Sequence, residues 1–247
     1  MISLALVCPP REPHWALLGT GYHLIQATWC LENGAYRDFY KACGGYRILD
    51  YQHIGAEAPD KPLSMAEFVE VAKYLEPDEV VSPDVLDDSS RTLRNLDVFL
   101  GADIPTHASV LFVPQGSTLK DWYLCLSRGV RFLREADVPY CIGICKKSQA
   151  LDPYHRSYAV YLASRHGPVH ILGARNVREF IEMAHLDVRS WDTSLPIAAA
   201  QLEGLLEDQP LNWKPQLIVH KSVFVSEYVL RNVHYIRKLL AGAPPLG

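Results

Sequence analysis

Short apolar runs recur along this chain at an almost constant interval, and each one closes in a polar residue or a glycine. The six clearest runs occupy residues 47–50, 79–84, 109–115, 140–146, 169–173 and 187–192. Their starting points lie 32, 30, 31, 29 and 18 residues apart. A strand with its crossover helix needs about 30 residues. The pattern therefore predicts repeated β/α units and, in a chain of 247 residues, a (β/α)8 TIM-like barrel.

Helix signals alternate with these runs. Ser64 with Glu67 has the pattern of a capping box, and Asn176 with Glu179 repeats it. Apolar residues at helical spacing predict a helix over 119–133. Two further helices are expected over 153–165 and 223–240, the second as the closing helix of the barrel.

The N-terminal unit follows a different pattern. Residues 1–8 and 15–18 predict strands, and 24–43 predicts a helix interrupted at Asn33-Gly34. The six residues between Cys8 and Trp15 cannot hold a crossover helix. One unit is therefore expected to be missing or replaced, so that the barrel is irregular at its start.

Composition fits a single domain over 1–247. The net charge of -4 argues against a surface that coats polyanions in general, but a local basic rim can still exist. Six cysteines without CxxC pairs predict buried free thiols, as in a reducing cytoplasm. No run approaches about 20 apolar residues, and residues 1–8 do not form a signal peptide. We expect an intracellular protein that is not inserted in a membrane.

Three runs end in an aspartate: Asp50, Asp84 and Asp192. Barrel chemistry lies at the carboxyl ends of the strands, and a carboxylate there can attack an electrophilic carbon. Asp192 is the candidate nucleophile, with a helix-capping role as its alternative. Asp84 follows Pro83, which suits a strand that stops at this point, although a turn role is equally open.

Two glycine motifs are further candidates. The first is Gln115-Gly116. The Gln115 amide can hydrogen-bond to the edge of a nucleobase, and Gly116 lets a ligand approach the backbone closely. A polar turn is the alternative interpretation. Gly143 lies inside a strand, where a glycine indicates that a ligand or a helix packs closely on the backbone.

The common cofactor motifs are absent. There is no GxGxxG, P-loop, HExxH or GxSxG pattern. His166 and His170 have a metal-site spacing without cysteine or carboxylate partners nearby in the sequence, so we interpret both as non-ligands. His53 near Asp50 is left unassigned. No metal or cofactor is predicted.

Taken in order, the motifs resemble those of the tRNA-guanine transglycosylase superfamily, pentosyltransferases that exchange guanine for a 7-deazaguanine on a (β/α)8 barrel. The resemblance covers roughly residues 47–195. It is carried by Asp84 and by four motifs: Phe112-Val113-Pro114-Gln115-Gly116, the run 140–146, His170-Ile171-Leu172-Gly173, and Trp191-Asp192-Thr193.

The resemblance implies a role for each matching residue. Asp192 is the nucleophile that forms a covalent sugar intermediate, and Asp50 is the residue for proton transfer. Asp84, Gln115 and Gly116 bind the base, with the backbone of Gly143 and Ile144 on its far edge. Beside these, the basic side chains that follow the strand ends are candidates for contacts with flanking phosphates, with solvated surface charges as the alternative interpretation: Lys146, Lys147 and Arg175.

The sequence also departs from the family pattern. The family's Asp-Ser-Gly-Gly-Phe is not reproduced after Asp50, and no cysteine follows Cys145 to build its zinc module. The compact phage and bacterial DNA 7-deazaguanine transglycosylases are a better match. That resemblance implies DNA rather than tRNA as the polymer, a free guanine or 7-deazaguanine base as co-substrate, no cofactor, and an intracellular setting such as a phage-infected bacterium.

Two other functions stay open. One is a barrel lyase or aldolase that acts on a small phosphorylated or keto substrate and binds phosphate at Gly173-Ala174-Arg175. The other is a non-catalytic relative that binds nucleic acid. The sequence leaves the incoming base and the oligomeric state undetermined.

Overall fold

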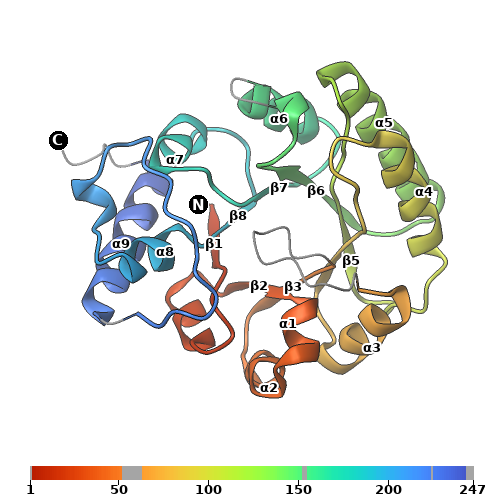
Figure 1. Cartoon of the computed structure of the whole chain (residues 1–247). Coiled ribbons are helices and arrows are strands. Elements are labelled where there is room, and N and C mark those ends of the chain that lie inside the picture. Colours follow the sequence, from red (N-terminus) through yellow and green to blue (C-terminus); the bar gives the residue numbers. More distant parts are fainter. Residues whose placement is uncertain (1, 52–62, 152–154, 224, 243–247) are drawn as a thin grey trace.

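The computed structural model describes residues 2–51, 63–151, 155–223 and 225–242. Eight parallel strands close into a barrel in chain order, and helices form a ring outside them (Figure 1). The strands are β1 (Ser3–Leu6), β2 (Tyr22–Gln26), β3 (Tyr46–Asp50), β4 (Glu79–Val81), β5 (Ser109–Phe112), β6 (Tyr140–Cys145), β7 (Val169–Leu172) and β8 (Ser190–Thr193). The predicted (β/α)8 barrel is confirmed, and the six spaced runs are β3 to β8.

The outer ring contains nine α-helices within the described ranges. They are α1 (Ala27–Glu32), α2 (Gly34–Ala42), α3 (Met65–Leu75), α4 (Ser89–Leu100), α5 (Leu119–Glu135), α6 (His155–Ser164), α7 (Val177–Met183), α8 (Leu195–Gln201) and α9 (Ser226–Leu240). The capping box ahead of α3 is present, because the Ser64 and Glu67 side chains each bond to the other residue's backbone N–H. Before α7, Asn176 accepts from the Glu179 N–H, while the Glu179 carboxylate bonds elsewhere.

The N-terminal unit corrects two predictions. Residues 15–18, expected as a strand, belong to the 3-10 helix η1 (Pro13–Leu18), and residues 22–26, expected mostly as helix, form β2. Pairing with β1 on one side and β3 on the other makes this segment a strand. Four of its five residues are buried, so an alternating pattern is absent and periodicity does not distinguish strand from helix. The predicted break at Asn33 is confirmed, since Asn33 caps α2.

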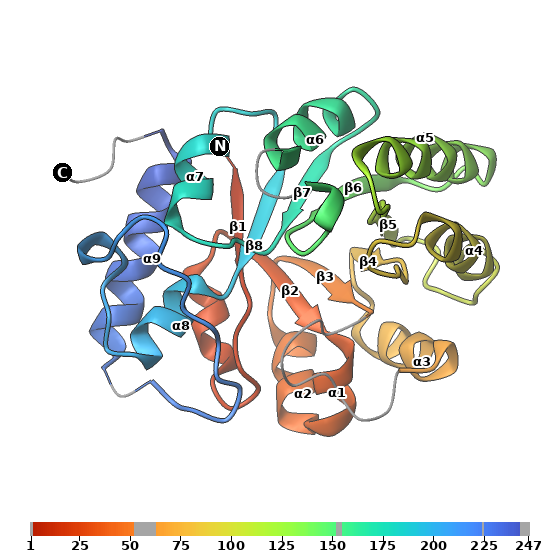
Figure 2. The same ribbon diagram turned by 45° about the horizontal axis from the view of Figure 1, so that its top comes forward.

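The replaced unit leaves the barrel wall beside β1 without a crossover helix of its own. α8 and α9 pack against each other, and α9 also contacts η1 (Figure 2). The C-terminal helix therefore covers the side of the barrel that the N-terminal unit does not. This agrees with its predicted role as the closing helix.

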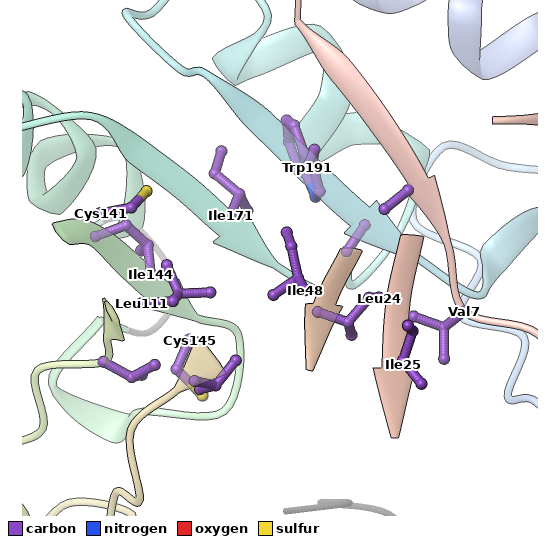
Figure 3. Close-up of a cluster of buried hydrophobic side chains, with 14 of the residues drawn as sticks. Val7, Leu24, Ile25, Ile48, Leu111, Cys141, Ile144, Cys145, Ile171 and Trp191 are labelled. Atoms are coloured by element: carbon purple, nitrogen blue, oxygen red, sulfur yellow. The ribbon is translucent and has the colours of Figure 1, made fainter. Parts of the chain in front are cut away.

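Buried apolar side chains from neighbouring strands fill the space within and around the barrel, among them Leu24, Ile48 and Ile171 (Figure 3). Burying a side chain of this size is worth about 1.5–3 kcal/mol relative to leaving it exposed. All six cysteines are free and all but Cys43 are buried, as predicted. In the parts of the chain described, no helix is long and apolar enough to cross a membrane.

Candidate active site

The carboxyl ends of the strands surround a cavity of about 500 Å³, a size typical of small-molecule sites. The strand ends and the segment 215–219 contribute its walls. The lining residues are Val7, Leu24, Gln26, Asp50, Val81, Asp84, Val113, Cys145, Lys146, Lys147, Leu172, Gly173, Ala174, Asp192, Ser194, Leu195, Pro215, Gln216, Leu217 and Val219. The three aspartates predicted from the strand ends, Asp50, Asp84 and Asp192, therefore meet at one cavity.

Asp192 is held firmly at the edge of this cavity. The residue is only 4% exposed. Oδ1 accepts a hydrogen bond from the Gly173 backbone N–H at 3.0 Å, and Oδ2 lies 3.1 Å from His170 Nε2. A carboxylate oxygen has two lone pairs, so each oxygen keeps one for a further partner. Asp192 is in β8 and does not cap a helix, because Ser194 is the residue at the start of α8.

His170 connects Asp192 to a chain of buried polar groups inside the barrel. His170 Nδ1 lies 2.8 Å from Ser190 Oγ, which also accepts from Arg189 Nε at 3.1 Å. Ser190 Oγ accepts from Arg189, which leaves its own hydroxyl proton available to His170 Nδ1. A carboxylate only accepts, so His170 Nε2 is the donor to Asp192.

This series of hydrogen bonds ends at an ion pair between Arg189 and Glu79, and Glu79 is in β4, across the barrel from β8. Arg189 donates from Nη1 and Nη2 to the two oxygens of Glu79, at 3.2 and 2.6 Å, and the Glu79 side chain is fully buried. The guanidinium also lies over the rings of Tyr22 and Tyr46. Asp192 is thus connected through the donors of His170, Ser190 and Arg189 to Glu79, which accepts at the end of the network.

Asp84 follows β4, and its environment differs. Gln115 Nε2 donates to Asp84 Oδ2 at 2.5 Å. Burial raises the pKa of Asp84 to about 6, and the Gln115 hydrogen bond opposes that rise. Gln115 is fully buried, and its Oε1 accepts from the Asp87 N–H at 3.3 Å. Gln115 therefore positions Asp84 and does not itself line the cavity.

Asp50 ends β3 and accepts a hydrogen bond from Gln26 Nε2 at 2.9 Å. Gln26 is buried at the end of β2, and its Oε1 is a buried acceptor without a partner among the described residues. A ligand in the cavity that Gln26 lines can supply the missing donor. His53, which the sequence left unassigned, lies outside the described residues.

The two predicted glycine sites have structural explanations. A Cβ at Gly116 would lie 2.3 Å from the backbone N of Trp122, so the first turn of α5, and not a ligand, requires glycine there. A Cβ at Gly143 would lie 2.9 Å from methyl groups of Leu172 and Val113. Neighbouring side chains fill that space, in place of the expected ligand or helix. Ile144 is fully buried, and its carbonyl accepts from Arg156.

The three basic residues take different positions. Lys146 is half-buried and lines the cavity, with its side chain lying over Gly173. Lys147 is exposed at the cavity mouth. Arg175 donates from Nε and Nη2 to the Lys146 carbonyl, at 3.0 and 2.8 Å. Their contacts with phosphates stay predictions.

A loop after the barrel completes the site. Gln201 in α8 is fully buried, donates to the carbonyls of Ile218 and Lys221, and accepts from the Ile218 N–H at 2.9 Å. These bonds hold the segment that supplies four lining residues. No sequence pattern indicates Gln201 or Gln26. The role of His170 was not predicted either, although one signal for it was available in the sequence. Residues two apart share one face of a strand, so Ser190 and Asp192 lie on one face of their strand, and His170 and Leu172 lie on one face of theirs.

No protein-family model matches this chain, and no curated protein resembles it at a significant level. Among the described residues, no group of three or more His, Cys, Asp or Glu is arranged to hold a metal ion.

Proposed function

We propose that this protein exchanges a purine base on a nucleoside of DNA, replacing guanine by a 7-deazaguanine through a covalent aspartyl-sugar intermediate. The supporting observation is the meeting of Asp50, Asp84 and Asp192 at one cavity of nucleobase-ligand size. The resemblance of the ordered motifs adds the reaction type.

In the first step, the Asp192 carboxylate attacks C1′ of the deoxyribose. The new O–C1′ bond forms as the C1′–N9 bond breaks, and the electron pair leaves with guanine, which takes up a proton. The bonds from His170 and Gly173 fix the direction of Asp192 before the reaction, so little reorganisation is needed when it attacks. In the second step, the incoming base attacks C1′, loses its N9 proton and displaces the carboxylate.

Recognition of the base falls to Asp84, with Gln115 behind it. An ionised carboxylate accepts hydrogen bonds from adjacent N–H groups, which guanine and 7-deazaguanines carry on their N1 and exocyclic amine. The target base must leave the duplex stack to reach the cavity, at a cost of a few kcal/mol. Asp50, beside Gln26, is the residue proposed to accept and return the proton of N9.

The test is an exchange assay with radiolabelled guanine and either DNA or tRNA. Wild-type protein is expected to place label in DNA. Asp192→Asn is expected to lose the activity by about 10³-fold or more, since a nucleophile has no substitute. Asp187→Asn is the matched control, because the same change falls on an exposed residue shortly before β8 and should leave exchange unaltered.

A second readout follows the intermediate itself. Omitting the incoming base should leave a protein–DNA adduct that survives denaturing electrophoresis in wild type and is absent in Asp192→Asn. Label in neither polymer would reject base exchange. Label in tRNA alone would show that the polymer substrate is tRNA and not DNA. If both the wild-type protein and Asp192→Asn bind DNA but neither exchanges the base, the protein is a non-catalytic nucleic-acid-binding protein.

A further inference from the structure

The Lys146 side chain has a position that base exchange does not use. It follows the end of β6 and lines the same cavity as Asp192. Its carbon chain lies over Gly173, such that a Cβ on that glycine would be 2.7 Å from Lys146 Cδ and 3.2 Å from Nζ. Gly173 has φ of +68°, and its N–H is the one that holds Asp192. The Lys146 amine and the Asp192 carboxylate are therefore both close to Gly173.

The Lys146 amine also lacks the partners that a structural ammonium has. No hydrogen-bond acceptor or salt-bridge partner for Nζ occurs within the residues described, whereas the nearby Arg156 guanidinium bonds to Glu179 and to three carbonyls. A lysine amine becomes a nucleophile toward carbonyl compounds when it is desolvated or lies near other cations. Lys146 meets both conditions.

The charges around Lys146 act in two directions. Burial lowers its pKa, the Asp192 carboxylate opposes this, and the charges of Arg156 and Lys147 lower it further, with a small opposing effect from Cys145. The net direction is downward, which increases the fraction of uncharged amine at neutral pH.

From this position in the cavity we infer that Lys146 is a nucleophilic amine that forms an imine with an aldehyde, the group that a pentose exposes at C1 when its ring opens. This activity goes beyond base exchange and needs no nucleic acid. The Nζ lone pair attacks the carbonyl carbon to give a carbinolamine. Asp192, supported by His170, takes the proton released from nitrogen and returns it to the hydroxyl. That group leaves as water while the C=N bond forms, and no oxidant or reductant takes part.

The experiment is reductive trapping on the full chain. Glycolaldehyde is the probe, cyanoborohydride reduces the imine to a stable secondary amine, and peptide mass mapping locates the adduct. Lys146 is expected to be labelled several-fold faster than Lys147 at pH 7, because burial and the nearby charges of Arg156 and Lys147 lower the pKa of the Lys146 amine and so increase its uncharged, nucleophilic fraction.

Two variants sharpen the result. Lys146→Arg keeps the positive charge and cannot form an imine, so the fast labelling should disappear. Lys120→Arg makes the matched change on an exposed lysine of α5 that does not line the cavity and should leave fast labelling in place. Equal labelling of Lys146 and Lys147 in the wild-type protein, which requires no variant to fold, would overturn the inference. Because no DNA or base is present, that result would leave base exchange undecided.

Discussion

Two aspartates face the same cavity from opposite sides of the barrel, Asp84 after β4 and Asp192 in β8, four strands apart in the ring. Asp192 accepts one bond at each oxygen, from His170 and from Gly173. Asp84 has the single side-chain bond from Gln115, and burial raises its pKa to about 6. The same residue type therefore accepts two hydrogen bonds from fixed donors in one place and, in the other, has a pKa that burial raises toward neutrality.

The largest effect is expected at Glu79, the last residue of the hydrogen-bond network that begins at Asp192. Glu79→Gln removes the charge that pairs with Arg189 in the barrel and should lower the free energy of unfolding by about 3 kcal/mol. Chemical denaturation measures this. Glu135→Gln is the control, because its pair with Arg131 is exposed at the helix surface and should change stability by less than about 0.5 kcal/mol. If Glu79→Gln lowers the free energy of unfolding as little as Glu135→Gln does, the ion pair does not stabilise the network that holds Asp192.

The Asp84 side should respond to pH instead. Folding raises this pKa from 3.8 to about 6, so the native state prefers the protonated form. The stabilising contribution is complete below pH 4 and is lost as pH rises to 6. The loss is less than about 3 kcal/mol, since one pKa unit equals about 1.4 kcal/mol and solvent reaches part of the carboxyl. Asp84→Asn should remove this slope from denaturation curves, whereas Asp97→Asn, on the exposed face of α4, should keep it.

Gln115→Leu tests the bond that distinguishes the two aspartates. Loss of the amide leaves Asp84 buried without its side-chain donor, which should cost about 1–3 kcal/mol. Because the Gln115 bond lowers the pKa of Asp84, the substitution should raise that pKa and move the pH-dependent step upward. Titration of the Asp84 carboxyl by NMR would follow it. A downward move would mean that Gln115 bonds the protonated form.

The smallest effect is expected at Gly173, the residue that touches both Asp192 and Lys146. Gly173→Ala keeps the N–H but places a Cβ at positive φ, with a cost of about 1–2 kcal/mol, and displaces the Lys146 chain. Stability should fall by that amount, and aldehyde labelling of Lys146 should slow. Gly101→Ala is the control, because its φ is -87° and a Cβ there is in open space except for one ordinary contact at 3.6 Å.

The sequence predicted the barrel because six of its units carry the same strand and helix signals. It failed at β2, where pairing on both sides decides the structure and the local pattern does not. Asp50, Asp84 and Asp192 could be expected at one rim, since the fold brings all strand ends together. His170 could not be assigned, because its role depends on the register that places it opposite Ser190 in β8. Gly116 and Gly143 were predicted to make room for a ligand. Packing against α5 explains the glycine at 116, and neighbouring side chains explain the glycine at 143.

The pairing of β1 with β8 has a consequence for how the protein is made in a cell. The ribosome releases the segment 3–6 long before its neighbour 190–193 exists, and the helix that lies beside that seam, α9, comes later still. Through most of translation, one edge of the first strand therefore has open backbone groups. We expect the ring to close only after synthesis of residue 193, so that the emerging chain exposes an unpaired strand edge until then.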